Sequence, residues 1–173
     1  MTYALVAILV VVAGILGFAA TRPDAFRLER SILIAAPADR IHPMINDFRR
    51  WPNWSPWENK DPGMARTLSG AESGVGAAYA WDGNKDIGAG RMEILESSPA
   101  RVVIKLVFLR PFEAHNLAEF TLTPEGPGTR VTWAMSGPQP FIGKLMGLVF
   151  SIERMVGPDF ETGLATLKRQ AEA

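Results

Sequence analysis

The final third of the chain reads FIGKLMGLVFSIERMV over residues 141–156, then Gly157, then PDFETGLATLKRQA over residues 158–171. Apolar residues recur here at steps of three or four, which is the spacing of one face of a helix. They are Phe141, Leu145, Leu148, Ile152, Val156, Phe160, Leu164 and Leu167. Gly157–Pro158 predicts one break, since proline inside a helix removes a backbone hydrogen bond. The rest of the predicted architecture depends on where this amphipathic segment buries its apolar face.

The residues before it predict a sheet for the helix to cover. Seven segments of strand-like composition are separated by turn sequences such as Asp82-Gly83-Asn84. The segments are 26–35, 65–69, 76–81, 88–96, 101–109, 113–123 and 129–136. One short helix interrupts them; it opens at Ala36-Pro37-Ala38-Asp39 and has apolar residues at Ile41, Met44, Ile45 and Phe48. The fold class is therefore predicted to be α+β, with an antiparallel sheet of six to seven strands packed on the last helix.

Alternation along the predicted strands assigns side chains to the two faces of the sheet. In segment 113–123, Ala118, Phe120 and Leu122 share one face, and Glu119 lies on the other. The same pattern puts Val131, Trp133 and Met135, and also Tyr79 and Trp81, on the apolar face. Such side chains either pack against the helix or line a cavity, and the pattern allows both.

Three tryptophans occur within seven residues, in Trp51-Pro-Asn-Trp54-Ser-Pro-Trp57. The two prolines exclude a regular helix interior or a central strand, so the segment is predicted to be a stiff irregular loop. One interpretation is a hydrophobic cluster that closes one end of the core. The other places Trp54 and Trp57 at a cavity mouth or on an interaction surface.

The N-terminal segment from Tyr3 to Ala20 contains no charged residue. About eighteen helical residues span roughly 27 Å, which is enough for the hydrocarbon core of a bilayer. We therefore predict a transmembrane anchor over residues 1–22, followed by one domain over residues 23–173. A cleaved signal peptide is the alternative, although no basic residue precedes the apolar run. Arg22 and Arg27, which follow the apolar run, favour a cytoplasmic location for the domain. No basic residue precedes the run, so the charges on its two sides cannot be compared and the side of the membrane stays open.

Composition excludes several classes of function. Eighteen basic and eighteen acidic residues leave no net charge, and no basic stripe is present, so a nucleic-acid partner is not expected. Without cysteine there are no disulfides or thiolate sites, and His42 and His115 have no metal-ligand spacing, so no metal is expected. The Gly-x-Gly pairs at 74–76 and 88–90 lack a third glycine and do not open a helix, so no nucleotide or other cofactor is expected.

Acid–base chemistry is the enzymatic option that the residues leave open. Arg91, Glu93 and Glu96 share one predicted strand, and His115 and Glu119 share another. A carboxylic acid buried in an apolar cavity has a raised pKa that suits proton transfer. The alternation pattern nevertheless directs His115 and Glu119 away from the apolar face, so no catalytic residue is assigned.

The order of short segments along residues 26–171 resembles the START-like superfamily, and more closely the polyketide cyclase/dehydratase-like branch of the SRPBCC proteins. The segments that carry this resemblance are Ala36-Pro37, Asp47-Phe48 with Trp51, Trp54-Ser55-Pro56-Trp57, Gly128-Thr129-Arg130-Val131-Thr132-Trp133, Asp159-Phe160-Glu161, Gly163-Leu164 and Leu167-Lys168. The resemblance implies a helix-grip (START/Bet v 1-like) fold, in which a curved sheet surrounds the C-terminal helix and a hydrophobic cavity. Such a fold does not by itself assign a function.

Three functions follow as hypotheses. The first is binding of a hydrophobic small molecule or lipid in a cavity between the sheet and the last helix, in a domain tethered to a membrane. The second is a cyclase/dehydratase-like enzyme without metal or nucleotide, and the third is a protein-interaction module. The predicted ligand-binding residues are Trp54, Trp57, Tyr79, Trp81, Phe120, Trp133, Met135 and Phe160.

Residues 141–156 are apolar almost all round, unlike the single apolar face that follows Pro158. A helix of this kind is buried in a core, packed against another chain or placed against lipid. Core helix, cavity lid and membrane-facing segment are therefore all open interpretations, and Gly157–Pro158 is the predicted hinge.

Overall fold

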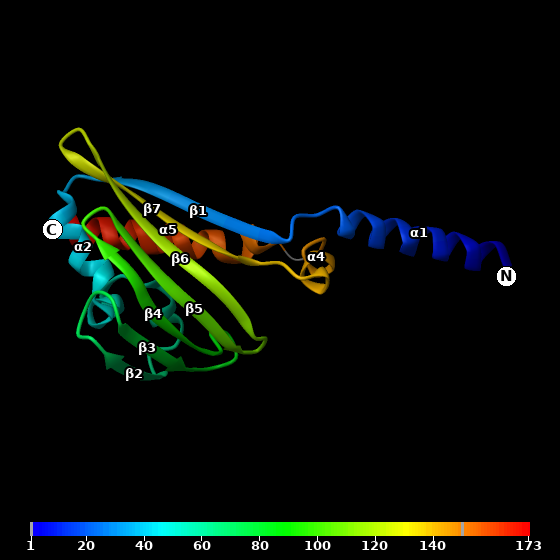
Figure 1. Ribbon diagram of the computed structural model, residues 1–173, viewed down its shortest axis with the longest axis horizontal. Coiled ribbons are helices and arrows are strands. Elements are labelled where there is room, and N and C mark those ends of the chain that lie inside the picture. Colours follow the sequence, from blue (N-terminus) through cyan, green and yellow to red (C-terminus); the bar gives the residue numbers. More distant parts are fainter. Residues whose placement is uncertain (1, 150) are drawn as a thin grey trace.

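The computed structural model describes residues 2–149 and 151–173; Met1 and Phe150 lie outside the description. Its order of elements is α1 (Thr2–Ala20), β1 (Ala25–Ile34), α2 (Ala38–Asn46), η1 (Phe48–Asn53), α3 (Pro56–Lys60), β2 (Ala65–Gly70), β3 (Ala77–Asp82), β4 (Ala89–Ser98), β5 (Arg101–Arg110), β6 (Ala114–Glu125), β7 (Gly128–Pro138), α4 (Phe141–Met146) and α5 (Ile152–Glu172). Helix α1 projects away from the rest, and α4 lies beside its base (Figure 1).

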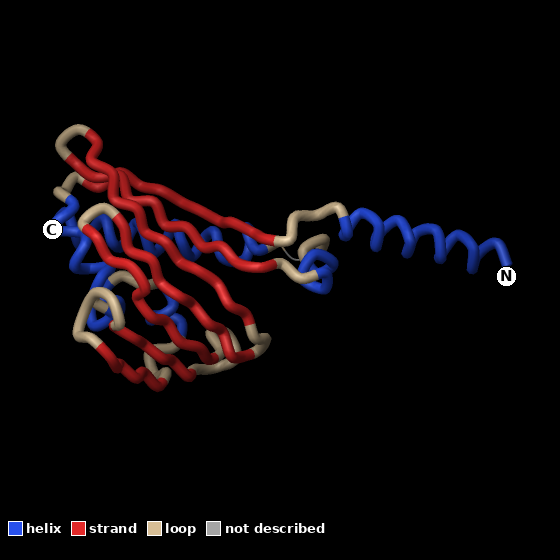
Figure 2. Tube along the Cα trace, in the orientation of Figure 1, coloured by secondary structure: helices blue, strands red, loops and turns tan. Residues whose placement is uncertain are grey.

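The seven strands form one antiparallel sheet in the order β1-β7-β6-β5-β4-β3-β2. All seven predicted strand segments are confirmed, and so is the α+β helix-grip architecture. Strand β4 carries irregular register at Ala89/Gly90 and at Ile94/Glu96, and such bulges bend a sheet. Helix α5 runs along the concave side of the bent sheet, where β1 and β7 contact it, and α2 and α3 cover the remaining part of that side (Figure 2).

The predicted faces of the sheet are confirmed by burial. Ala118, Phe120 and Leu122 of β6 are buried, as are Val131, Trp133 and Met135 of β7. From α5, Phe160, Leu164 and Leu167 complete this core with 2% exposure or less. Burial of so many large apolar side chains, at about 1.5–3 kcal/mol each, is the main stabilising contribution to the domain.

The predicted helix break at Gly157–Pro158 is wrong. Helix α5 continues through both residues, and the interruption lies between Met146 and Ile152. The main reason is tertiary packing, because the apolar face of α5 is buried against the sheet. The Arg30 side chain of β1 adds contacts, since it lies over Gly157 and bonds two acids on the same helical face. Its Nε donates to Glu161 at 2.8 Å, and Nη2 pairs with Glu153. These contacts, together with the buried apolar face, hold the helix on the sheet despite the hydrogen bond that Pro158 cannot make.

The segment with three tryptophans is largely helical, so the prediction of an irregular loop is wrong for Trp51 and Trp57, whereas Trp54 lies in the turn between the two helices. Phe48–Asn53 forms a 3₁₀ helix and Pro56–Lys60 a short α-helix. Pro56 occupies the first turn of α3, where a missing N–H has no helical partner to lose. Two short helices thus accommodate both prolines of this segment.

Two glycines of α5 provide a matched test of this packing. A Cβ at Gly163 would lie 2.9 Å from Cζ3 of Trp133 and 3.0 Å from Cδ of Pro56, which are buried ring atoms. A Cβ at Gly157 would meet only the mobile end of Arg30, at 2.7 Å from Nη2. We expect Gly163→Ala to lower the free energy of unfolding by about 1–3 kcal/mol through overpacking.

For Gly157→Ala we expect a change below about 1 kcal/mol, because better helix propensity offsets the displaced ion pairs. Urea unfolding of the wild type and the two variants measures both changes in the free energy of unfolding. A larger loss for Gly157→Ala than for Gly163→Ala would contradict the packing described.

Candidate functional site

Aromatic side chains from four parts of the chain meet between the sheet and α5. We call Trp54, Trp57, Phe120, Trp133 and Phe160 the aromatic cluster. Trp133 is at its centre, stacked on Phe160 with 4.1 Å between ring centroids and on Phe120 with 4.9 Å. Trp54 and Trp57 approach Trp133 edge-on, at 5.6 and 5.4 Å. Stacked and edge-on pairs are the favoured aromatic geometries, so the cluster is well packed.

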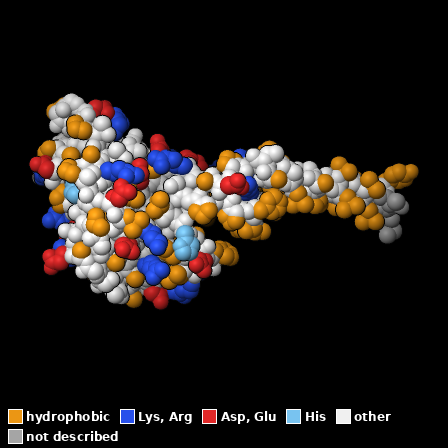
Figure 3. Space-filling view, viewed as in Figure 1, with side chains coloured by type: hydrophobic (Ala, Val, Ile, Leu, Met, Phe, Trp, Pro, Cys, Tyr) orange, Lys and Arg blue, Asp and Glu red, His pale blue; other side chains and the backbone are white. Residues whose placement is uncertain are grey.

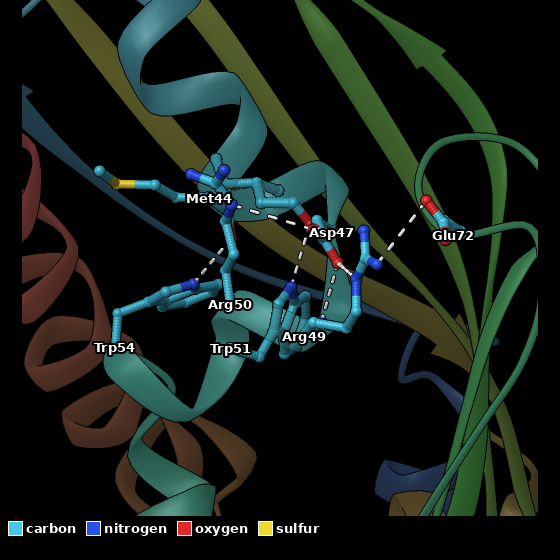
Figure 4. A network of polar contacts seen from close by, with 8 residues as sticks. Met44, Asp47, Arg49, Arg50, Trp51, Trp54 and Glu72 are labelled. Atoms are coloured by element: carbon cyan, nitrogen blue, oxygen red, sulfur yellow. Dashed lines mark hydrogen bonds and ion pairs between the residues drawn. The ribbon is translucent and has the colours of Figure 1, made fainter.

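Hydrogen bonds fix the tryptophans that precede α3. The indole Nε1 of Trp51 donates to the carbonyl of Ile45 at 3.0 Å, and that of Trp54 donates to the carbonyl of Met44 at 2.9 Å. Both carbonyls belong to the last turn of α2, where helical carbonyls lack a partner within the helix. The tryptophan segment is thereby attached to the end of α2 (Figure 4).

A charged network holds the start of the same segment. Asp47 accepts the backbone N–H of Arg49 at 3.0 Å and its Nε at 2.9 Å, and Glu72 lies beyond Arg49 (Figure 4). The Arg49 guanidinium, with smaller contributions from the Arg49 backbone and Arg50, lowers the pKa of Asp47 from its usual value. Asp47 therefore stays ionised and caps η1 at neutral pH.

The indole N–H of Trp133 differs from those of Trp51 and Trp54. Trp133 is 2% exposed, and its Nε1 has no hydrogen-bond partner among the residues that the structure describes. A buried donor without an acceptor costs about 1–3 kcal/mol. This donor lies within the aromatic cluster, enclosed by the neighbouring rings.

A buried carboxylate lies at the β2–β3 end of the core. Glu58 of α3 is 6% exposed; its Oε1 accepts the Tyr79 hydroxyl at 2.7 Å and its Oε2 accepts Nε of Arg66 at 2.7 Å. Burial, followed by the Glu58 carboxylate, raises the pKa of Tyr79. The phenol is therefore neutral throughout the physiological range and acts as a hydrogen-bond donor.

Glu58 was not singled out from the sequence. Its sequence pattern is that of an acidic residue in the first helical turn after Pro56. An acid at this position usually indicates only a favourable interaction with the helix dipole. Nothing in the local pattern shows that α3 would be packed against the open edge of the sheet, where Tyr79 and Arg66 complete the group.

The structure brings together five of the eight residues predicted to bind a ligand, namely those of the aromatic cluster. Met135 is buried two residues beyond Trp133 on the same strand face. Tyr79 stacks on Trp81, with 6.4 Å between the ring centroids. Its link to the cluster is indirect and passes through Phe48, whose ring centroid lies 5.9 Å from that of Tyr79. Trp57 and Trp81 are only partly buried, whereas the other six predicted residues are buried.

The acid–base candidates lie outside this region. His115 is exposed and contacts Glu113 at 2.9 Å, and Glu119 pairs with Arg101 at 2.7 Å. Their predicted orientation away from the apolar face is confirmed. Arg91 and Glu93 line a groove of about 260 Å³ on the outer side of the sheet. These groups therefore do not border the aromatic cluster.

His42 and the carboxylates form no candidate metal centre. Partial burial lowers the pKa of His42, whose Nε2 lies 3.4 Å from Oγ of Ser97. Within residues 2–149 and 151–173, no group of three or more His, Asp or Glu side chains is arranged to hold a metal ion.

Comparison with known proteins identifies relatives of the domain. The sequence model of the family described as polyketide cyclase/dehydrase and lipid transport matches residues 25–172. A search of curated proteins found no match for the chain.

Solved structures share the fold at low sequence identity. Protein CV1439 from Chromobacterium violaceum superposes with a TM-score of 0.60 at 17% identity, over 88% of this chain and 99% of that one. Ginseng major latex-like protein 151 from Panax ginseng gives a TM-score of 0.62 at 13% identity, over 87% and 100% of the two chains.

A polyketide-pathway protein is also similar. The di-domain ARO/CYC protein StfQ from the steffimycin biosynthetic pathway gives a TM-score of 0.63 at 14% identity, over 86% of this chain and 51% of that one. At these identities the three structures show a shared fold.

The Glu58–Tyr79 hydrogen bond predicts a pH-dependent contribution to stability. Tyr79→Phe leaves Oε1 of Glu58 without its buried donor, so we expect a loss of about 1–2 kcal/mol in the free energy of unfolding at pH 7. Because folding raises the pKa of Tyr79 above 10, the wild-type hydroxyl stabilises fully below pH 10 and less as pH rises further.

The difference in the free energy of unfolding between wild type and Tyr79→Phe should therefore become smaller above pH 10. Urea midpoints from pH 7 to 11 measure it, with Tyr3→Phe as a control for removing a hydroxyl outside the domain. A difference that stays constant or grows above pH 10 would contradict the buried, neutral phenol.

Proposed function

The chain belongs to the polyketide cyclase/dehydrase and lipid transport family, and from this premise we propose that it binds a hydrophobic small molecule or lipid against the aromatic cluster. The ligand would lie between the sheet and α5, in a domain held at a membrane by α1. Desolvation of apolar surface would provide most of the affinity, and a few polar groups would orient the ligand.

The indole N–H of Trp133, for which the described part of the chain provides no acceptor, is the observation that carries this proposal. It is enclosed by Phe120 and Phe160, whose rings offer apolar surface on both sides of the indole. A ligand oxygen would satisfy the donor and remove the free-energy cost of leaving it unpaired. The site thus favours a planar apolar molecule that carries at least one carbonyl, hydroxyl or carboxylate.

Trp57 is the side chain that would admit such a ligand. The rings of the cluster occupy the space between sheet and helix, and Trp57 is the member that is partly exposed. Helix α3 around it is held at its middle by Glu58, which bonds Tyr79 of the sheet, and at its last residue by Lys60, whose Nζ lies 2.6 Å from Asp159 of α5. Rotation of the Trp57 side chain would open the cluster while these bonds keep α3 in place.

Helix α1 supports the membrane location. The residues Tyr3–Ala20 are long and apolar enough to span a bilayer, and almost none of them is buried by the rest of the protein. A helix that is apolar on all sides and unpacked in water requires another apolar environment. A secretory signal sequence passes the same test, and N-terminal sequencing of protein isolated from cells distinguishes the two.

Native mass spectrometry of the full-length protein, extracted in mild detergent, tests the binding function directly. We expect a bound molecule of low mass that is released on denaturation. Tight apolar binding makes such a complex slow to dissociate. If no bound species is present and none of the probes below binds, the proposal fails.

Trp133→Phe tests the role of the indole N–H with matched probes. 1-Tetralone and tetralin share their ring system, but only the ketone carries an acceptor. We expect the wild type to prefer 1-tetralone by roughly three- to ten-fold, which corresponds to one hydrogen bond, and Trp133→Phe to lose that preference. Isothermal titration measures both affinities.

Trp54→Phe is the matched control, because its N–H already donates to Met44. We expect this variant to keep the preference for the ketone. An equal preference in wild type and Trp133→Phe would show that the ligand does not use this donor.

A cyclase-like activity is a second candidate, and the buried Glu58–Tyr79 pair is the observation that favours it. Glu58 can take a proton from the carbon next to a carbonyl if the Tyr79 hydroxyl turns from Glu58 and donates instead to the oxygen on which negative charge develops. Deuterium exchange at C2 of 1-tetralone, followed by NMR, would then be faster with the protein and slow in Glu58→Gln. Exchange at the uncatalysed rate would reject this candidate.

A further inference from the structure

Helix α4 and the residues after it expose an unusual amount of apolar surface. We call Phe141, Ile142, Met146 and Val149 the α4 surface. Ile142 is 64% exposed and Val149 77% exposed, and the other two are also exposed. Isolated apolar residues on a surface are common, but a contiguous group within nine residues indicates a binding surface.

The polar side of α4 is already occupied. Lys144 is 7% exposed, and its Nζ bonds Asp24 in the connection between α1 and β1 at 2.6 Å. Lys144 lowers the pKa of Asp24, so the pair persists at neutral pH. The bond fixes the rotation of α4, and the α4 surface consequently faces away from the domain.

The α4 surface continues onto α1. Helix α1 contacts α4, and Ala19 near the end of α1 is fully buried, whereas the preceding residues from Ala4 onward are exposed. Hydrophobic side chains extend without a gap from α1 over the α4 region in Figure 3. Arg22, whose guanidinium lies 5.0 Å from the ring of Phe18, marks the polar boundary at the end of the apolar segment.

We propose that the α4 surface docks on the membrane that α1 enters, with α4 lying in the interfacial region beside the span. This inference rests on the membrane location proposed for α1. Short amphipathic segments with large apolar residues on one side bind at this depth, and a preceding transmembrane helix removes most of the entropic cost of bringing them to the bilayer.

The docked orientation follows from the fold. The ends of β1 and β7 nearest α1, and the beginning of α5, face the bilayer, whereas the turn between β2 and β3 and the C-terminus point away from it (Figure 1). The domain is therefore held against the membrane by two adjacent contacts rather than swinging on α1 alone.

Because the chain contains no cysteine, a single introduced cysteine gives a unique labelling site. Full-length Ile142→Cys and Val149→Cys, each labelled with bimane, are placed in phosphatidylcholine–phosphatidylglycerol vesicles that contain lipids with a doxyl quencher in the upper acyl chain. We expect quenching several-fold stronger than for Ser73→Cys, which is exposed in the β2–β3 turn at the far end of the domain.

Val10→Cys in the middle of α1, labelled in the same way and measured with lipids that carry the doxyl group near the end of the acyl chain, separates this inference from its premise. Quenching at Val10 without quenching at Ile142 and Val149 would overturn the docking while the anchor stands. No quenching at Val10 would contradict the anchor and the docking with it. Labels at Ile142 and Val149 that escape both the lipid quencher and aqueous iodide would show that a protein covers the surface, which also overturns docking on lipid.

Discussion

The stacking of Trp133 on Phe160 is the contact on which the arrangement of the domain depends. Trp133 lies near the middle of β7 and Phe160 near the middle of α5, so their 4.1 Å separation sets how closely the helix approaches the sheet. Gly163, one turn further along α5, leaves room for the edge of the indole and for Pro56. Sheet, α5 and the tryptophan segment are thus packed around one side chain, because a flat ring contacts neighbours on both faces and along its edges.

Charged contacts then decide where the covering helices lie along the sheet. Arg30 holds the first turns of α5 through Glu153 and Glu161, and Glu58 holds α3 at the open edge of the sheet. Exposed ion pairs of this kind contribute little stability, whereas the bonds of the buried Glu58 contribute more. Their common effect is positional, since each pair joins a helix to one particular point of the sheet.

The two ends of the domain offer different surfaces. One carries the tryptophan segment, attached to α2; the other carries α4, whose Lys144 is buried and whose apolar residues are exposed. The ligand site proposed around Trp133, near the middle of β7, and the membrane contact proposed at α4 use different surfaces and are therefore compatible. The shared fold alone would not distinguish these roles, which depend on particular side chains.

The sequence by itself determined the strands, their inner and outer faces, the amphipathic last helix and the membrane-length segment, because these follow from periodicity and composition within a few residues. It also placed Phe120 and Trp133 on the apolar face of the sheet and Phe160 on the apolar face of the last helix. Only the tertiary structure decided that α5 runs through Pro158, that Glu58 is buried with Tyr79, and that the Trp133 indole N–H has no acceptor within residues 2–149 and 151–173. Each of these features depends on residues that are distant in the chain. Local secondary-structure propensity carries no information about which distant residues make the contact.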